Sequence, residues 1–63
     1  MRGVYKAIFR RVDGTLRIVY FTAPREEELL LMAQAALLNK YPTMLAKDRG
    51  VVVELYQVDQ VEA

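Results

Sequence analysis

The side chains that most often carry catalysis are absent from this sequence. The chain of 63 residues contains no histidine and no cysteine, and it also lacks serine. The commonest general base and the strongest nucleophile are therefore missing. Zinc, haem and iron–sulfur centres depend on the same residue types. We therefore expect a protein that is not an enzyme and that carries no metal or other cofactor.

The densest acidic group is formed by Glu26, Glu27 and Glu28. Consecutive residues of a helix point in different directions, so these carboxylates cannot converge on one substrate. Near the start of a helix they interact favourably with the positive end of its dipole. Their position therefore indicates a structural role.

The N-terminal third of the chain contains three basic residues and one aromatic residue that could act together. They are Lys6, Arg10, Arg17 and Phe21. In the pairing described below they share one face of a hairpin, and Arg10 lies opposite Arg17, where an anion would relieve the repulsion of like charges. Single-stranded nucleic acids bind to such combinations by base stacking and phosphate contacts. A solvated sheet face covered by long basic side chains has the same composition.

Residues 4–12 and 15–22 alternate and are rich in β-branched and aromatic side chains, as in two strands. The intervening Asp13-Gly14 is typical of a two-residue type I′ turn. This turn makes Val12 and Thr15 the last pair of the hairpin. The predicted core face contains Tyr5, Ala7, Phe9, Leu16, Ile18 and Tyr20. A three-residue loop with a glycine bulge would shift this pairing.

A helix is predicted for residues 24–40, because Pro24 suits its first turn and Pro42 disfavours its continuation. Its apolar residues occupy more than one side. One arc, suited to packing on a sheet, contains Leu29, Leu30, Met32, Ala33, Ala36 and Leu37. The opposite side carries Leu31, Ala35 and Leu38, where a surface helix normally carries charge.

Residues 39–50 are expected to connect the helix to a last strand at 51–58, with a short extra strand near 44–46. The sequence therefore predicts a single α+β domain, 1–63, with β-β-α-β order. A right-handed crossover places the last strand beside the first and antiparallel to it, which gives a three-stranded sheet of order 2-1-3. One helix packs on one face of this sheet.

Composition favours self-association. Hydrophobic residues make up 54% of a short chain that cannot form disulfides, and chains of this size often gain stability as oligomers. A net charge of +1 argues against general attraction to nucleic acid. The longest apolar run is too short to span a bilayer, and basic residues interrupt the N-terminal apolar runs. We therefore expect no membrane association and a cytoplasmic protein.

The first function hypothesis is a homodimeric interaction module that binds another macromolecule, such as a second protein. Leu31, Ala35 and Leu38 are its candidate self-association residues, and the outer face of the hairpin competes for this role. The second hypothesis is a small nucleic-acid-binding protein that uses Lys6, Arg10, Arg17 and Phe21.

Overall fold

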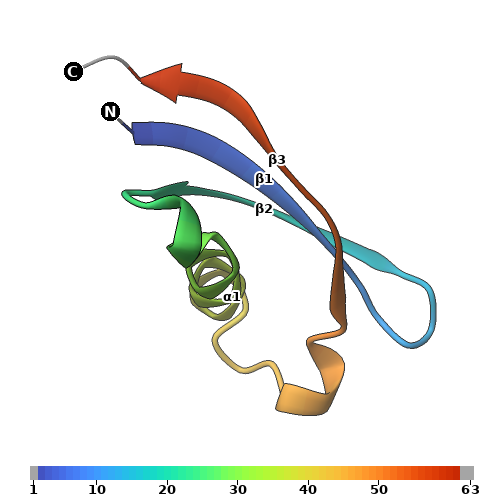
Figure 1. Ribbon diagram of the computed structural model, residues 1–63. Coiled ribbons are helices and arrows are strands. Elements are labelled where there is room, and N and C mark those ends of the chain that lie inside the picture. The colour runs from blue at the N-terminus through green and yellow to red at the C-terminus, as the bar shows by residue number, and fades with distance from the viewer. Residues whose placement is uncertain (1, 62–63) are drawn as a thin grey trace.

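The chain folds into a three-stranded antiparallel sheet with one helix on one face (Figure 1). The computed structural model describes the backbone of residues 2–61 and the side chains of residues 3–58. Its elements are β1 (Arg2–Arg10), β2 (Leu16–Ala23), α1 (Leu29–Lys40) and β3 (Val51–Val61). The strand order is β2-β1-β3. The predicted α+β class, element order and sheet order are therefore confirmed.

The hairpin between β1 and β2 is closed by a three-residue loop, not by the predicted two-residue turn. The amide of Gly14 donates to the carbonyl of Arg11 at 2.9 Å, and the amide of Arg11 donates to the carbonyl of Thr15 at 2.9 Å. Gly14 has a φ of 90°. This arrangement is a tight turn followed by a glycine in a positive-φ conformation, the second commonest way to close a hairpin.

The longer loop shifts the pairing of β1 and β2 by one residue. Phe9 lies opposite Arg17, and Ala7 lies opposite Val19. Because side chains alternate along a strand, the shift moves every residue of β2 to the other face. The prediction that Leu16, Ile18 and Tyr20 belong to the core face is therefore wrong, and all three are exposed.

The core lies between α1 and the face of the sheet that β1 and β2 present to it. It consists of Ala7, Phe9, Val19, Phe21, Ala23, Ala33 and Leu37. The rings of Tyr5 and Phe21 stack at a centroid distance of 5.8 Å. Leu29, Met32 and Ala36 pack against this core as predicted, whereas Leu30 is exposed. The helix therefore buries a narrower arc than the sequence indicates.

The helix ends at Lys40, as predicted. The predicted start at Pro24 is wrong, because Arg25 is extended and a 3-10 turn, Glu26–Glu28, precedes the α-helical part, which begins at Leu29. Within this turn Glu28 forms an ion pair with Arg25 at 2.5 Å. The three carboxylates thus precede the helix, where the positive end of its dipole favours them.

The connector between α1 and β3 contains a 3-10 turn, Ala46–Asp48. The expected short strand at 44–46 is therefore wrong. β3 is longer than predicted, and its pairing with β1 is irregular between Val4 and Tyr5 and between Ile8 and Phe9. Such bulges twist an edge strand and make edge-to-edge pairing less favourable.

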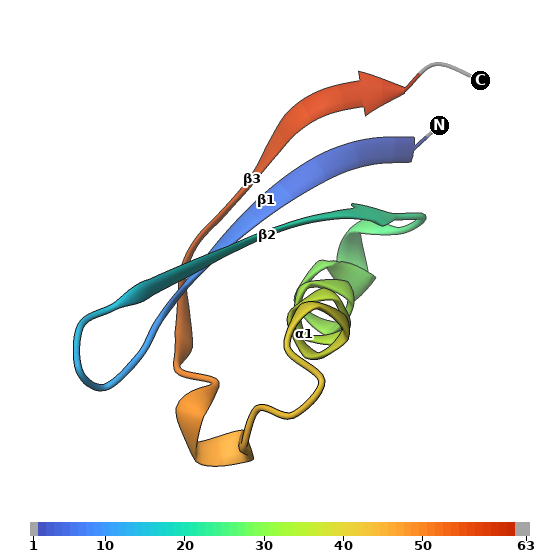
Figure 2. The ribbon, with the colours of Figure 1, turned by 180° about the vertical axis from the view of Figure 1, so that it is seen from behind.

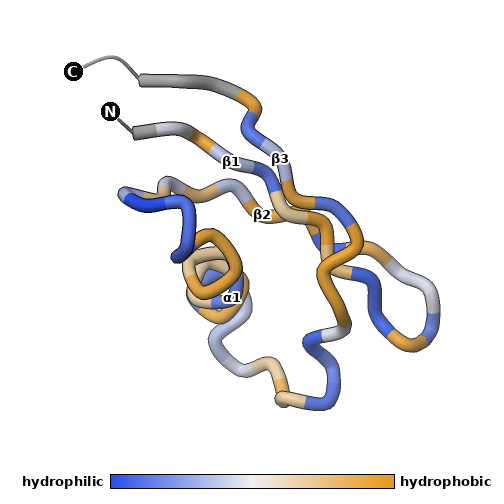
Figure 3. The backbone as a smooth tube through the Cα atoms, in the orientation of Figure 1, coloured by the Kyte–Doolittle hydropathy of each residue, from blue (hydrophilic) through white to orange (hydrophobic). Residues whose placement is uncertain are grey.

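The molecule is elongated, with principal extents of 39 × 19 × 17 Å. The helix lies under β2, and the hairpin loop extends well beyond it, as the view from behind also shows (Figure 2). Hydrophobic residues occur along both the helix and the strands (Figure 3). A two-layer domain buries only the surfaces between its layers, so the outer surfaces of both layers retain apolar residues.

Replacing Gly50 with alanine should destabilise the fold more than replacing Gly14 with alanine. Both glycines have positive φ, at 78° and 90°, which costs a residue with a side chain about 1–2 kcal/mol. A Cβ at Gly50 would in addition collide with the carbonyl oxygen of Arg10, whereas a Cβ at Gly14 meets nothing within 4 Å. Urea denaturation of both variants measures the difference. Equal losses would contradict the close approach of Gly50 to β1.

Candidate functional site

The outer sheet face, which is the side of the sheet opposite α1, is the first candidate site. Because β1 is the central strand, residues of the three strands form rows across this face. Three of these rows are Tyr20–Lys6–Tyr56, Ile18–Ile8–Glu54 and Leu16–Arg10–Val51, and a further row pairs Val4 with Thr22 and Asp59. In the part of the chain that the structure describes, no element covers this face.

The first row places a lysine between two exposed aromatic rings. The Nζ atom of Lys6 lies 5.8 Å from the ring centroid of Tyr20 and 5.9 Å from that of Tyr56. Tyr20 is 60% exposed and Tyr56 is 44% exposed. A hydrogen bond with the Tyr56 side chain and charge interactions with Tyr20 and Tyr56 raise the pKa of Lys6 above 10.5. The ammonium group of Lys6 thus lies within cation–π distance of both rings.

The other rows are mainly apolar. Leu16 is 57% exposed, Ile18 and Val51 are also exposed, and Ile8 is buried among its neighbours. An open face of an antiparallel sheet normally carries polar residues. An exposed surface that combines aliphatic and aromatic side chains with arginine is typical of a macromolecular interface.

The predicted group of Lys6, Arg10, Arg17 and Phe21 is not brought together. Lys6 and Arg10 lie on the outer sheet face, but Arg17 and Phe21 lie on the face that packs against the helix and connector. Phe21 belongs to the core. The prediction that Arg10 lies opposite Arg17 is wrong, because Arg10 pairs with Leu16.

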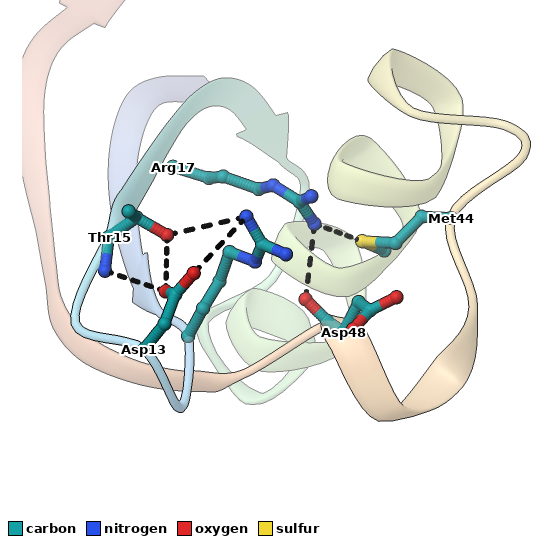
Figure 4. A network of polar contacts seen from close by, with 6 residues as sticks. Asp13, Thr15, Arg17, Met44 and Asp48 are labelled. Carbon is teal, nitrogen blue, oxygen red and sulfur yellow. Dashed lines mark hydrogen bonds and ion pairs between the residues drawn. The ribbon is translucent and has the colours of Figure 1, made fainter.

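Arg17 links β2 to the connector. Its Nη1 donates to the carbonyl of Asp48 at 3.1 Å and to the sulfur of Met44 at 2.6 Å (Figure 4). Its guanidinium carbon lies 4.7 Å from the ring centroid of Tyr41. Tyr41 and Met44 themselves pack against the core. The side chain of Arg17 therefore has a structural role.

The sequence reasoning missed Tyr20 and Tyr56. Tyr20 was assigned to the core through the one-residue error in register, and the last strand was not given a register at all. The signal that could have corrected the first error is Thr15. The carboxylate of Asp13 accepts hydrogen bonds from the Thr15 amide at 3.0 Å and from the Thr15 hydroxyl at 2.7 Å, which stabilises the longer loop. These bonds hold the pKa of Asp13 below its ordinary value of 3.8.

The helix stripe, formed by Leu31, Ala35 and Leu38, is the second candidate surface. Leu31 is 60% exposed and Leu38 is 42% exposed, and Ala35 between them is also exposed. The connector could have folded over these residues, but its Tyr41 and Met44 pack against the core instead. Within the part of the chain that the structure describes, the helix stripe therefore stays uncovered.

Apart from these two surfaces, the described residues form one shallow pocket of note. A shallow pocket of about 470 Å³ beside the hairpin is lined by Arg10, Arg11, Val12, Gly14, Gly50 and Val51. Among the described residues, no three acidic, histidine or cysteine side chains gather where they could hold a metal ion. Within the same part of the chain, no helix is long and apolar enough to cross a membrane.

Replacing Arg17 with alanine should lower the free energy of unfolding by about 1–3 kcal/mol, since the change removes a hydrogen bond to a carbonyl and a cation–π contact. Replacing the exposed Arg10 is the matched control and should change it by less than about 0.5 kcal/mol. Thermal or urea denaturation measures both. A loss for Arg10→Ala as large as that for Arg17→Ala would contradict the assigned faces.

Replacing Tyr56 with phenylalanine should move the pKa of Lys6 back toward its ordinary value, because the hydroxyl group is the largest cause of the upward shift. A lysine whose folded-state pKa is raised contributes stability that is fully present below pH 10.5 and is lost as the pH rises through the folded-state pKa. NMR titration of the Lys6 side chain measures the shift. An unchanged pKa in the Tyr56→Phe variant would show that the Tyr56 hydroxyl group does not form a hydrogen bond with Lys6.

Comparison of the chain with protein-family models, with curated proteins and with solved structures finds no match in any of the three. No activity or partner can therefore be transferred from a relative. The two exposed surfaces, the outer sheet face and the helix stripe, are the features from which function has to be inferred.

Proposed function

We propose that this chain is a non-enzymatic interaction module that forms a homodimer through the helix stripe and binds another macromolecule with the outer sheet face. The observation that carries this proposal is the exposure of Leu31 and Leu38 on the side of α1 opposite the core. Exposed leucines in such a small domain favour burial against a second surface. The lack of cysteine fits a reducing compartment, and we place the protein in the cytoplasm.

The helix stripe is self-complementary. Its residues are spaced by four and then three positions, which is the spacing of a coiled-coil seam. A small alanine lies between two leucines, so a second helix can approach closely at the centre. When the second copy runs antiparallel, the two Ala35 residues meet, and each Leu31 packs beside Leu38 of the other copy. A two-fold interface requires a surface of this kind.

The helix dipoles support the antiparallel arrangement. Two antiparallel helices oppose their dipoles, which favours this arrangement over a parallel one. The charged side chains at the ends of α1 contribute less, because Lys40 donates a hydrogen bond to the carbonyl of Ile18 and Glu28 pairs with Arg25 within the same copy.

Dimer formation through α1 leaves the outer sheet face free. The helix packs on the opposite side of the sheet (Figures 1 and 2), so a partner on the sheet does not compete with the second copy. Each dimer then presents two outer sheet faces that point away from the shared helices. An interaction module with two equivalent binding faces gains avidity for a partner that spans both.

Replacing Leu31 with glutamate should halve the mass of the particle in solution, because a charge buried within the apolar interface is desolvated without a partner. Light scattering behind a sizing column measures the mass, and circular dichroism shows whether the variant stays folded. The change lies on an exposed residue, so the fold should be retained.

Leu16→Glu is the matched control. Leu16 is a similarly exposed leucine, 57% against 60% for Leu31, but lies on the outer sheet face. We expect this variant to keep the dimer mass. A dimer that survives Leu31→Glu but dissociates with Leu16→Glu would show that the sheets, not the helices, form the interface. A monomeric wild-type chain would overturn the dimer altogether.

A further inference from the structure

We infer that the outer sheet face binds single-stranded nucleic acid, with Tyr20 and Tyr56 as stacking residues and Lys6 and Arg10 as phosphate contacts. This inference rests on the proposed function only in that it names the macromolecule bound by this face. It does not require the dimer.

The two tyrosines are placed to take two separate bases. They lie on β2 and β3, on either side of the central strand. Two strand spacings separate them, which is about 10 Å. Both rings are exposed and sit on a rigid sheet. Stacking on such rings tolerates any base, because every base has a π-face.

The cations lie between and beside these rings. Lys6 is in the same row as the tyrosines, and Arg10 is on the same strand and the same face. Four residues along a strand span about 13 Å, so a nucleic-acid strand that follows β1 can bring one phosphate to each cation. The contacts of Lys6 with two rings restrict where its ammonium group can lie.

Glu54 is the acidic residue nearest to both cations, because it pairs with Ile8 between the rows of Lys6 and Arg10, whereas Asp59 pairs with Val4 beyond the row of Lys6. A carboxylate repels phosphates but accepts hydrogen bonds from the exocyclic amino groups of cytosine or adenine. Its position between the cationic rows therefore favours bases over backbone at the β3 edge. A duplex hides its base faces, so it cannot use the tyrosines, and unpaired strands are the form that the face fits.

The electrostatic contribution to binding should be small, and the number of cations that contact phosphates can be obtained from the salt dependence of the affinity. Two cations that each neutralise one phosphate of a single strand give a slope of log K against log salt concentration of about −1.4. A face rich in positive charge would give a much steeper slope. The salt dependence therefore measures how many cations the face uses.

The experiment uses fluorescence anisotropy with a labelled single-stranded oligodeoxynucleotide of mixed sequence, about 12 nucleotides long, in a salt series that begins at low ionic strength. We expect Lys6→Gln to weaken binding and to reduce the slope by about 0.7. Lys47→Gln, a change of an exposed lysine in the connector, is the matched control and should leave the slope unchanged.

The stacking role of the two tyrosines is tested by variants that either remove or keep the aromatic ring. Tyr20→Leu and Tyr56→Leu keep an apolar side chain but lose the ring, and each should weaken binding about tenfold. Tyr20→Phe keeps the ring and should bind nearly as well as the wild type. Because the chain contains no tryptophan, quenching of tyrosine fluorescence by the oligonucleotide gives a second readout of stacking.

Three results would overturn the inference. They are absence of binding at low salt, equal effects of Lys6→Gln and Lys47→Gln, and a duplex that binds as tightly as the single strand. Tyr20→Leu and Tyr56→Leu variants that bind the oligonucleotide as tightly as the wild type would overturn the stacking role of the two rings. The Leu31→Glu variant separates the two proposals, because it should lose the dimer mass and keep the affinity per binding face.

Discussion

The backbone hydrogen bond from Arg11 to Thr15 determines which side of the sheet each residue of the hairpin occupies. It encloses three loop residues, and Gly14 supplies the positive φ that this loop needs. With one residue fewer in the loop, Val19 and Phe21 would face solvent, while Ile18 and Tyr20 would face the helix. The core, the Arg17 contacts and the outer sheet face all follow from this closure.

The position of the helix then decides what is left exposed. Its buried side is narrow and rests on small residues such as Ala33, and the rest of its surface keeps leucines that one sheet cannot cover. The opposite layer has the same property, because its outer side carries Tyr20 and Leu16 as well as charge. The two apolar surfaces differ in character. The helix stripe is aliphatic, whereas the outer sheet face combines aromatic rings, aliphatic side chains and charges of both signs.

The element order, the sheet order and the end of α1 were predictable, because turn residues, prolines and periodicity all indicate the same elements. The pairing register of the hairpin could not be predicted from burial, because β2 carries apolar residues on both faces. Ile18 and Tyr20 lie on one face, and Val19 and Phe21 lie on the other. Burial could therefore not choose between the two loops, and Asp13-Gly14 suits either. Only Thr15, whose amide and hydroxyl donate to the carboxylate of Asp13, favours the longer loop. The helix stripe was identified correctly as exposed because its position depends only on the helical repeat. The candidate binding residues on the sheet depended on register, so only Lys6 and Arg10 of the predicted group lie there.

The reactivity of single cysteines placed at neighbouring positions of β2 tests most directly which face of the sheet each residue occupies. The chain has no cysteine of its own, so a thiol reagent reports on one site at a time. Ile18→Cys, at a position 37% exposed on the outer sheet face, should react much faster than Val19→Cys, at a position 2% exposed in the core. If position 18 were protected and position 19 reacted rapidly, the hairpin would be closed by the two-residue turn. The core face and the outer face of β2 would then be exchanged, which contradicts the structure described above. Protection of both positions, relieved on dilution, would place the dimer interface on the sheet.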